Sequence, residues 1–255
     1  MKRAATGFAI SLVLAAAGCS SDEPAATADA SPIVGNVDAT VTPAVIRILP
    51  LGDSLTLGYG SGQEGAGSEP GYRMHLRELL VDAGISVDFV GTQANGPAAL
   101  ADNEHEGYNG YAVAQVGEVA GPAIDAHAPD IILLLCGTND QIEFVPPSQP
   151  PAGAAADFER LLEQLHARQP GVQIIAGKVI PLSFNDEGVS AYNDLLPAIV
   201  DRQRKSGVNV RLVDHYAIGE DALSSDGIHP TQVGYDAMAE VWLPAVLEAV
   251  ADVSR

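Results

Sequence analysis

A serine at the end of an apolar run is a candidate nucleophile. Gly52-Asp53-Ser54 ends the run at residues 45–51, whose composition predicts a buried strand that stops in a turn. A serine at the carboxyl end of a strand in an open α/β sheet has its hydroxyl clear of the sheet, beside helix-start amides that favour negative charge. Ser54 could therefore attack an electrophile; the alternative is a serine that only stabilises a turn.

An aspartate and a histidine near the end of the chain could activate such a serine. Asp226 precedes His229 by three residues, just before the last predicted helix. This spacing lets the carboxylate fold back toward Nδ1 of His229 and fix the tautomer in which Nε2 accepts a proton. The alternative is that both residues only cap the start of the helix.

A third segment offers a donor for developing negative charge. Gly137-Thr138-Asn139-Asp140 follows the apolar run at residues 131–136. The side-chain amide of Asn139 can donate a hydrogen bond to an oxyanion; the alternative is that it satisfies loop backbone.

These residues need a scaffold that brings them together, and the pattern of the chain predicts one. Short apolar runs alternate with amphipathic stretches, as in βαβ units of a parallel sheet. All carboxyl ends of such strands meet at one edge. The connections at 91–111 and 137–153 exceed the usual ~4–6 residues and are candidate functional loops. Predicted strands are 45–51, 87–90, 131–136, 172–177 and 208–213, and predicted helices are 72–83, 113–126, 154–168, 189–205 and 231–250.

Composition limits the classes of partner. The 255 residues include 33 acidic and 13 basic side chains, for a formal net charge of −20. Binding to nucleic acid or to an anionic membrane surface requires basic patches, so we expect neither. The apolar content of 47% fits one α/β domain with a sizeable core.

The first residues resemble a bacterial lipoprotein signal. Lys2 and Arg3 precede a short apolar stretch at residues 7–17, and small residues lead into Cys19. The stretch is too short to span a bilayer comfortably. The resemblance implies cleavage before Cys19 and lipid attachment to its thiol, which places the protein on the cell envelope outside the cytoplasm. The alternative is ordinary secretion.

The domain organisation follows from this assignment. Residues 1–18 are the predicted signal peptide, and residues 19–43, rich in Ala, Ser, Thr, Asp and Pro, form a lipid-attached flexible tether. Residues 44–255 form the folded domain. Cys136 is then the only unmodified thiol, and its apolar flanks predict a small core residue.

Four segments in chain order resemble the blocks of the SGNH, or GDSL, hydrolase family. They are Gly-Asp-Ser-Leu with Ser54, a glycine in a second block, Gly-Thr-Asn-Asp with Asn139, and Asp-Gly-Ile-His-Pro with Asp226 and His229. The resemblance implies a three-layer α/β/α sandwich with a five-stranded parallel, flavodoxin-like sheet. It implies Ser54 as nucleophile, His229 as base and Asp226 as its orienter, with no metal or organic cofactor.

The same resemblance implies an oxyanion hole made by the N–H of Ser54, a glycine N–H and the Asn139 amide. Gly110 best matches the family glycine because it opens the second predicted helix, where N–H groups point outward. Gly107, three residues earlier, is the alternative.

Flanking runs resemble the acetyl-xylan-esterase-like branch of the family. They are Gly71-Tyr72-Arg73, residues 87–91 and His105-Glu106-Gly107. The branch implies hydrolysis of short-acyl esters, such as acetyl groups on polysaccharide, through an acyl-enzyme. Alternatives are a lysophospholipase or thioesterase, acyl transfer to another acceptor, or a polysaccharide-binding lipoprotein without turnover.

Some charged residues near the candidate site have other interpretations. His105 and Glu106 invite a metal site but lack a repeated metal-ligand spacing, which favours solvation of the loop or substrate contact. Arg73 is expected to hold a loop carboxylate, and the alternative is that it binds substrate. Asp53 is expected to bond nearby backbone.

Overall fold

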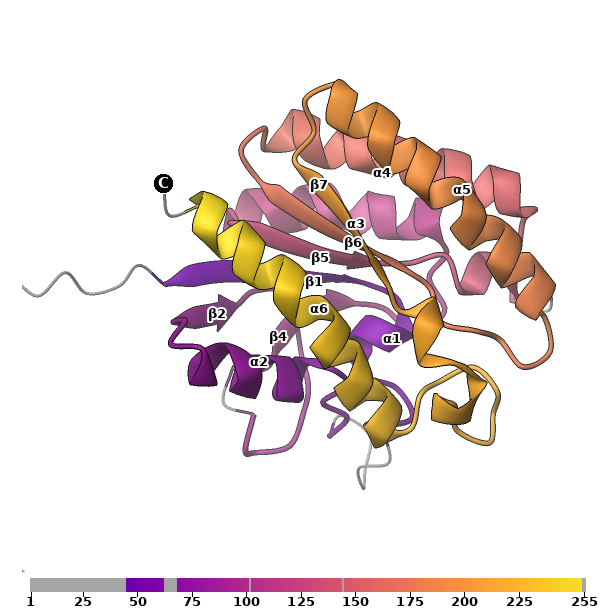
Figure 1. Ribbon diagram of the computed structural model, residues 1–255, viewed down its shortest axis with the longest axis horizontal. Coiled ribbons are helices and arrows are strands. Elements are labelled where there is room, and N and C mark those ends of the chain that lie inside the picture. The colour runs from indigo at the N-terminus through magenta and orange to yellow at the C-terminus, as the bar shows by residue number, and fades with distance from the viewer. Residues whose placement is uncertain (1–44, 62–67, 101, 144, 254–255) are drawn as a thin grey trace, which may run out of the picture. The chain divides into compact units, whose positions relative to one another are not determined.

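The fold is an α/β sandwich whose central sheet presents its strand ends at one edge (Figure 1). The computed structural model describes residues 45–61, 68–100, 102–143 and 145–253. The predicted signal peptide, the tether and Cys19 lie outside these residues.

An apolar strand, β1 (Ile46–Gly52), runs through the middle of the sheet because nearly all of its side chains are buried. It pairs in parallel with β5 on one side, in register from Ile48 opposite Ile131 to Gly52 opposite Leu135. On the other side of β1, the short parallel strand β2 pairs with the first half of β1, and the short parallel strand β4 pairs with its end. The strands are β2 (Val87–Phe89), β3 (Gln93–Ala94), β4 (Glu104–Gly107), β5 (Ile131–Leu135), β6 (Gln173–Lys178) and β7 (Val210–Asp214).

The order across the sheet is β3-β4-β1-β5-β6-β7, with β2 also paired to β1. The five predicted parallel strands are present, with bounds shifted by one or two residues. The strand count was wrong, because β3 and β4 lie inside the segment 91–111 that we expected to be a loop, and β3 runs antiparallel to β4. The sequence of β4, Glu-His-Glu-Gly, lacks apolar alternation, so periodicity could not identify it.

Helices cover both faces of the sheet. α2 packs against α6 on one face, whereas α3, α4 and α5 pack side by side on the other. The predicted three-layer arrangement is therefore confirmed. The helices are α1 (Ser54–Leu57), α2 (Arg73–Asp82), α3 (Val113–His127), α4 (Pro151–Arg168), α5 (Asp186–Lys205) and α6 (Gln232–Val253), and short 3₁₀ turns are η1 (Asn139–Gln141), η2 (Tyr216–Ile218) and η3 (Glu220–Ala222).

The core lies between the sheet and both helix layers. Every side chain of β5 is buried, and Trp242 packs with ring contacts to Tyr72 and His215. Cys136 is buried as predicted, and its burial raises the pKa of the thiol well above the usual value, so it is a poor nucleophile. Within the described ranges, no helix has both the length and the apolar character that a bilayer crossing requires.

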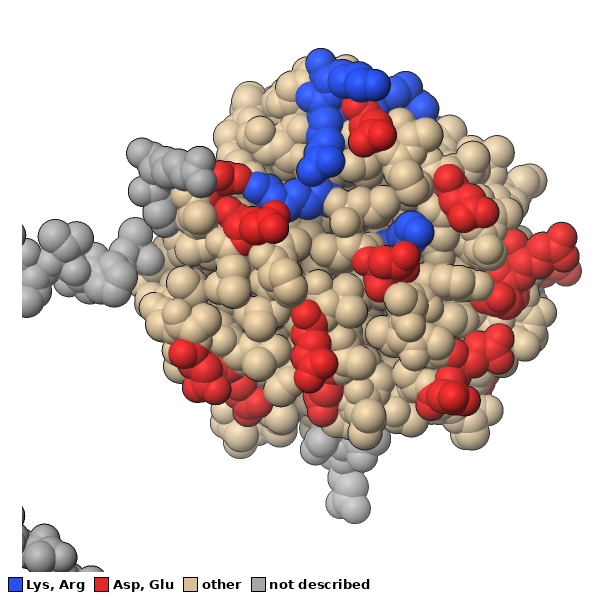
Figure 2. All heavy atoms as spheres, viewed as in Figure 1, with Lys and Arg blue, Asp and Glu red and all other residues tan. Residues whose placement is uncertain are grey.

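Surface charge is unevenly distributed. In the view of Figure 2, acidic side chains are scattered, whereas Lys and Arg gather at the end of the face where α5 ends. The last turn of α5 carries Arg202, Arg204 and Lys205, where positive charge favours a helix carboxyl end.

Candidate active site

Three side chains from opposite ends of the domain form one hydrogen-bonded chain. His229 Nε2 lies 2.9 Å from Ser54 Oγ, and His229 Nδ1 lies 2.7 Å from Asp226 Oδ2. Ser54 and His229 are almost completely buried. The structure thus brings together the three residues that the spacing singled out, in the order serine, histidine, carboxylate.

The Asp226 turn holds the histidine by its backbone as well as by its ring. Asp226 Oδ1 accepts the N–H groups of Ile228 and His229, each at 2.9 Å, and the Ser224 hydroxyl at 2.9 Å. Partial burial would raise the pKa of the Asp226 carboxyl, but these bonds and the one to the His229 ring outweigh it and lower the pKa to about 2. The carboxylate therefore stays ionised at neutral pH.

Ser54 is the first residue of α1, a single turn at the end of β1. Asp53 precedes it as the helix cap and accepts the N–H of Leu55 at 2.9 Å, as expected for a residue that bonds nearby backbone. Burial raises the pKa of Asp53 to about 7; the Leu55 bond opposes the rise and the negative charge of Asp140 adds to it. Asp53 is thus bonded to the backbone of α1, through which it acts on the site.

Arg73 anchors the same turn from behind. Its guanidinium is fully buried and donates to the carbonyls of Thr56 at 3.2 Å and Leu57 at 3.1 Å. These are carbonyls at the end of α1, which have no partner within the helix. The guanidinium also donates to the carbonyls of Asn95 and Asn103. The expectation that Arg73 holds a loop carboxylate was wrong: its hydrogen-bond acceptors are backbone carbonyls and an amide oxygen.

Asn139 lies beside the segment that carries Gly110. Its Nδ2 donates to the carbonyl of Tyr111 at 3.0 Å, which leaves its second amide hydrogen available. Asp140, the next residue, accepts the N–H of Val113 at the start of α3 at 3.0 Å. These bonds hold the turn η1 against the segment that leads into α3.

The two candidate glycines of the second block have different surroundings. The N–H of Gly107 donates to Nδ1 of His105 at 2.9 Å, so it is not available for a ligand. Gly110 has a φ of +79° with open space around its Cα. Within the described part of the chain, the N–H groups of Gly110 and Ser54 have no hydrogen-bond acceptor. This favours Gly110 over Gly107 as an oxyanion donor.

His105 and Glu106 are structural residues of the scaffold. Burial, helped by the charge of Arg73, lowers the pKa of His105 to about 2, and its Nε2 lies 2.5 Å from Asn95 Oδ1. The Glu106 carboxylate accepts the Thr92 N–H at 2.8 Å and the Tyr108 hydroxyl at 2.6 Å. Among the residues that the structure describes, no group of three His, Cys, Asp or Glu side chains is placed to hold a metal ion.

Sequence reasoning missed two features that support the histidine. The ring of Tyr59 packs on the His229 ring, with centroids 4.6 Å apart. A segment between β6 and α5 ties the two catalytic loops together, because Ser183 N–H donates to Gly227 O at 3.0 Å and Asn185 Nδ2 donates to Gln141 O at 2.6 Å. No local pattern predicts either contact, since each depends on segments far apart in the chain.

The geometry fits covalent catalysis on a carbonyl. A serine hydroxyl bonded to an oriented imidazole can be deprotonated as it attacks. Donors at Ser54 N, Gly110 N and Asn139 Nδ2 are the kind of groups that stabilise the resulting oxyanion.

Known proteins with related sequences and structures agree with this chemistry. The chain is 30% identical over 235 residues to a multidomain esterase of Ruminococcus flavefaciens. The aligned region covers 79% of this chain and 28% of that protein. It resembles the structure of a family 3 carbohydrate esterase from Clostridium thermocellum, with 28% identity, a TM-score of 0.70, and coverage of 83% of this chain and 100% of that one. A serine-to-alanine mutant of an acetyl esterase, solved with an acetate ion, has 26% identity and a TM-score of 0.71, with coverage of 82% and 100%.

The family is established by a match that includes most of the domain. The chain spans only 28% of the length of the curated relative described above, so that likeness concerns one part of a longer protein. The family model, in contrast, matches residues 51–237. This range begins in β1, ends in α6 and contains Ser54, Asp226 and His229. This protein therefore belongs to the GDSL-like lipase/acylhydrolase family.

Proposed function

We propose that this protein is a serine esterase that removes short acyl groups, acetyl above all, from polysaccharide. One observation carries the proposal: the continuous chain from Ser54 Oγ through His229 to Asp226, at 2.9 and 2.7 Å. The acetyl and carbohydrate parts are supported by the names of the esterases that the chain resembles.

The reaction proceeds in two halves. Ser54 Oγ attacks the ester carbonyl while His229 Nε2 takes its proton, and the oxyanion is stabilised by Ser54 N–H, Gly110 N–H and the Asn139 amide. The tetrahedral intermediate collapses, His229 returns the proton to the departing alcohol, and an acyl-serine remains. Water then attacks the acyl-serine while His229 Nε2 takes its proton. The second tetrahedral intermediate collapses, the acid leaves, and His229 returns the proton to Ser54 Oγ.

Replacement of the nucleophile tests this proposal. We expect Ser54→Ala to lower kcat on p-nitrophenyl acetate by roughly four orders of magnitude or more, without change in the melting temperature. Ser206→Ala, at the exposed end of α5, serves as the matched control with full activity. A fluorophosphonate probe should label the wild type at Ser54. Turnover by Ser54→Ala above a matched blank would overturn the assignment.

We further propose that the protein is exported and held on the cell envelope by lipid on Cys19. The basic residues at positions 2 and 3, the apolar stretch and the small residues before Cys19 support this, and two or more acyl chains make a stable anchor. We expect wild-type protein in the membrane fraction and Cys19→Ala in the soluble fraction. An unchanged membrane location of the variant would contradict lipid anchoring.

A further inference from the structure

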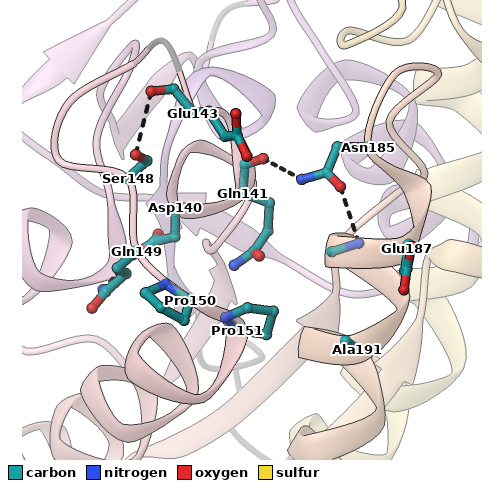
Figure 3. A pocket seen from close by; sticks show the side chains of 11 residues that line it. Asp140, Gln141, Glu143, Ser148, Gln149, Pro150, Pro151, Asn185, Glu187 and Ala191 are labelled. Atoms are coloured by element: carbon teal, nitrogen blue, oxygen red, sulfur yellow. Dashed lines mark hydrogen bonds between the residues drawn. The ribbon is translucent and has the colours of Figure 1, made fainter.

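A pocket with both polar and apolar walls lies beside the turn that carries Asn139. It has a volume of about 530 Å³, which is within the usual range for small-molecule sites. Figure 3 shows its walls: the turn η1 and the residues after it on one side, the start of α4 below, and the start of α5 opposite. It is lined by Asp140, Gln141, Glu143, Ser148, Gln149, Pro150, Pro151, Asn185, Glu187, Gly188 and Ala191.

The pocket is joined to the candidate catalytic groups by short covalent and hydrogen-bonded connections. Gln141 is on the same 3₁₀ turn as Asn139, two residues further on. Asn185 donates to the carbonyl of Gln141 at 2.6 Å, and Ser183, two residues before Asn185, donates to Gly227 in the turn between Asp226 and His229. A group bound here is therefore held by the same segments that position the oxyanion donor and the base.

One wall holds a polar atom with no partner. Gln141 is 3% exposed, and within the described residues its Nε2 has no hydrogen-bond acceptor. In Figure 3 its amide lies at the floor of the pocket, between η1 and the first residues of α4. An unpaired buried amide costs free energy, so a ligand that offers oxygen atoms gains by accepting its hydrogen bond.

An aromatic side chain borders the same space. A smaller hollow of about 190 Å³ is lined by Gln141, Glu143, Phe184 and Asn185 and thus shares three residues with the larger pocket. Phe184 is 48% exposed and lies next to the catalytic turn, because a Cβ added at Gly227 would be 3.9 Å from its Cδ1. An exposed ring offers an apolar platform for the C–H face of a sugar.

The charge of the lining excludes one class of ligand. Glu143 and Glu187 are exposed in the pocket wall, and none of the described lining residues is Lys, Arg or His. The amino end of α5 would attract anions, but Asp186 and Glu187 in its first turn offset the helix dipole. An anionic ligand would meet like charges here.

We propose that this pocket binds the alcohol portion of the ester as a neutral sugar, with Gln141 and Phe184 as specificity-determining residues, and that it rejects anionic alcohols. The inference rests on the proposed esterase activity. It adds where the alcohol portion of the ester binds and that this alcohol is uncharged. Seven of the eleven described lining residues carry an amide, hydroxyl or carboxylate group, which can bond the hydroxyl groups of a sugar, and Pro150, Pro151 and Ala191 offer apolar surface to its C–H groups.

Two acetates that differ only in the alcohol test the proposal. The measured quantity is the ratio of kcat/KM for an acetylated xylo-oligosaccharide to kcat/KM for ethyl acetate. We expect Gln141→Ala and Phe184→Ala each to lower this ratio about tenfold, mainly through KM for the sugar, because a sugar-binding contact is lost. Phe184 is exposed, so its variant should fold even where Gln141→Ala does not. Leu195→Ala, on the exposed face of α5, is the control with an unchanged ratio.

A second comparison tests the charge. Wild type should prefer acetylated glucose to acetylated glucuronate about tenfold or more, and the double variant Glu143→Gln, Glu187→Gln should reduce that preference. Equal rates on the two sugars in the wild type would overturn the charge argument.

The outcomes separate the inference from the proposed function. If wild type hydrolyses neither ethyl acetate nor the sugar acetate, the esterase proposal fails. If it hydrolyses both and the two variants keep the wild-type ratio, only the inference fails. If the variants instead change the preference between acetate and butyrate esters of one alcohol, the pocket binds the acyl group and the inference is wrong.

Discussion

Asp226 contacts His229 twice: Oδ2 lies 2.7 Å from ring Nδ1, and Oδ1 accepts the backbone N–H of the same residue at 2.9 Å. We expect Asp226→Asn to separate these roles. The amide oxygen can keep the backbone bonds, but the NH₂ group cannot accept from Nδ1–H and favours the wrong tautomer of the ring. Catalysis should fall by roughly two to four orders of magnitude in kcat, with little change in melting temperature. Steady-state kinetics on p-nitrophenyl acetate measure this, and a variant within threefold of wild type would show that the carboxylate does not orient the base.

The side-chain amide of Asn139 is expected to act only as charge develops. Asn139→Ala removes the donor and should lower kcat roughly 10²- to 10³-fold, with a much smaller change in KM. Asn139→Asp keeps the shape of the side chain but offers no N–H, so it should lose at least as much. If Asn139→Asp retained activity while Asn139→Ala lost it, the shape of the side chain and not hydrogen-bond donation would be what the site requires.

Substitution by alanine should destabilise the protein much more at Gly107 than at Gly110. A Cβ on Gly107 would lie 2.4 Å from the backbone nitrogen of Leu57, so Gly107→Ala must displace the turn that carries Ser54. We expect a loss of about 3 kcal/mol or more in the free energy of unfolding. Gly110→Ala meets open space and should cost about 1–2 kcal/mol for its left-handed backbone.

Urea unfolding of both variants measures the difference, and kcat measured on the folded Gly110→Ala protein shows whether its backbone N–H keeps its place. A larger loss of stability for Gly110→Ala than for Gly107→Ala would contradict the assignment of Gly107 as the packing glycine.

Asp53 should make the stability of the fold depend on pH. Its pKa is raised from 3.8 to about 7 in the folded protein, so the folded state holds a proton that the unfolded state releases. The stability that protonated Asp53 contributes to the folded state is fully present below about pH 4 and is lost as the pH rises to about 7. Asp53→Asn cannot ionise. We therefore expect its free energy of unfolding to rise relative to that of the wild type by roughly 2–4 kcal/mol as the pH is raised from about 4 to about 7.

The test is the difference in unfolding free energy between Asp53→Asn and wild type, measured at several pH values. The buried histidines His105 and His215, whose pKa values are lowered to about 2 and about 3, destabilise both proteins in acid and cancel in this difference. A difference that stays constant with pH would show that Asp53 is ionised in the fold.

The residues that form the candidate site were predictable because each has a local pattern. Ser54 follows an apolar strand, and Asp226 and His229 have a spacing that a single turn can close. The scaffold around them was harder to predict. The strand β4 contains His105 and Glu106, which are buried and bonded to Thr92, Asn95 and Tyr108.

The Arg73 interactions show the same limit. Its side chain was expected to meet a carboxylate, but its acceptors are backbone carbonyls and one amide oxygen that only the folded chain gathers around it. Tertiary contacts of this kind have no periodicity along the sequence and no composition that identifies them.

The way in which Arg73 holds the nucleophile turn has a consequence for sequence drift. Its partners at positions 56, 57, 95 and 103 contribute main-chain oxygens, which every amino acid possesses. Apart from the amide oxygen of Asn95, the side chains at those positions can be exchanged without removing an acceptor. The loops beside Ser54 are thus free to diversify toward new substrates, while one buried cation keeps the catalytic turn in place.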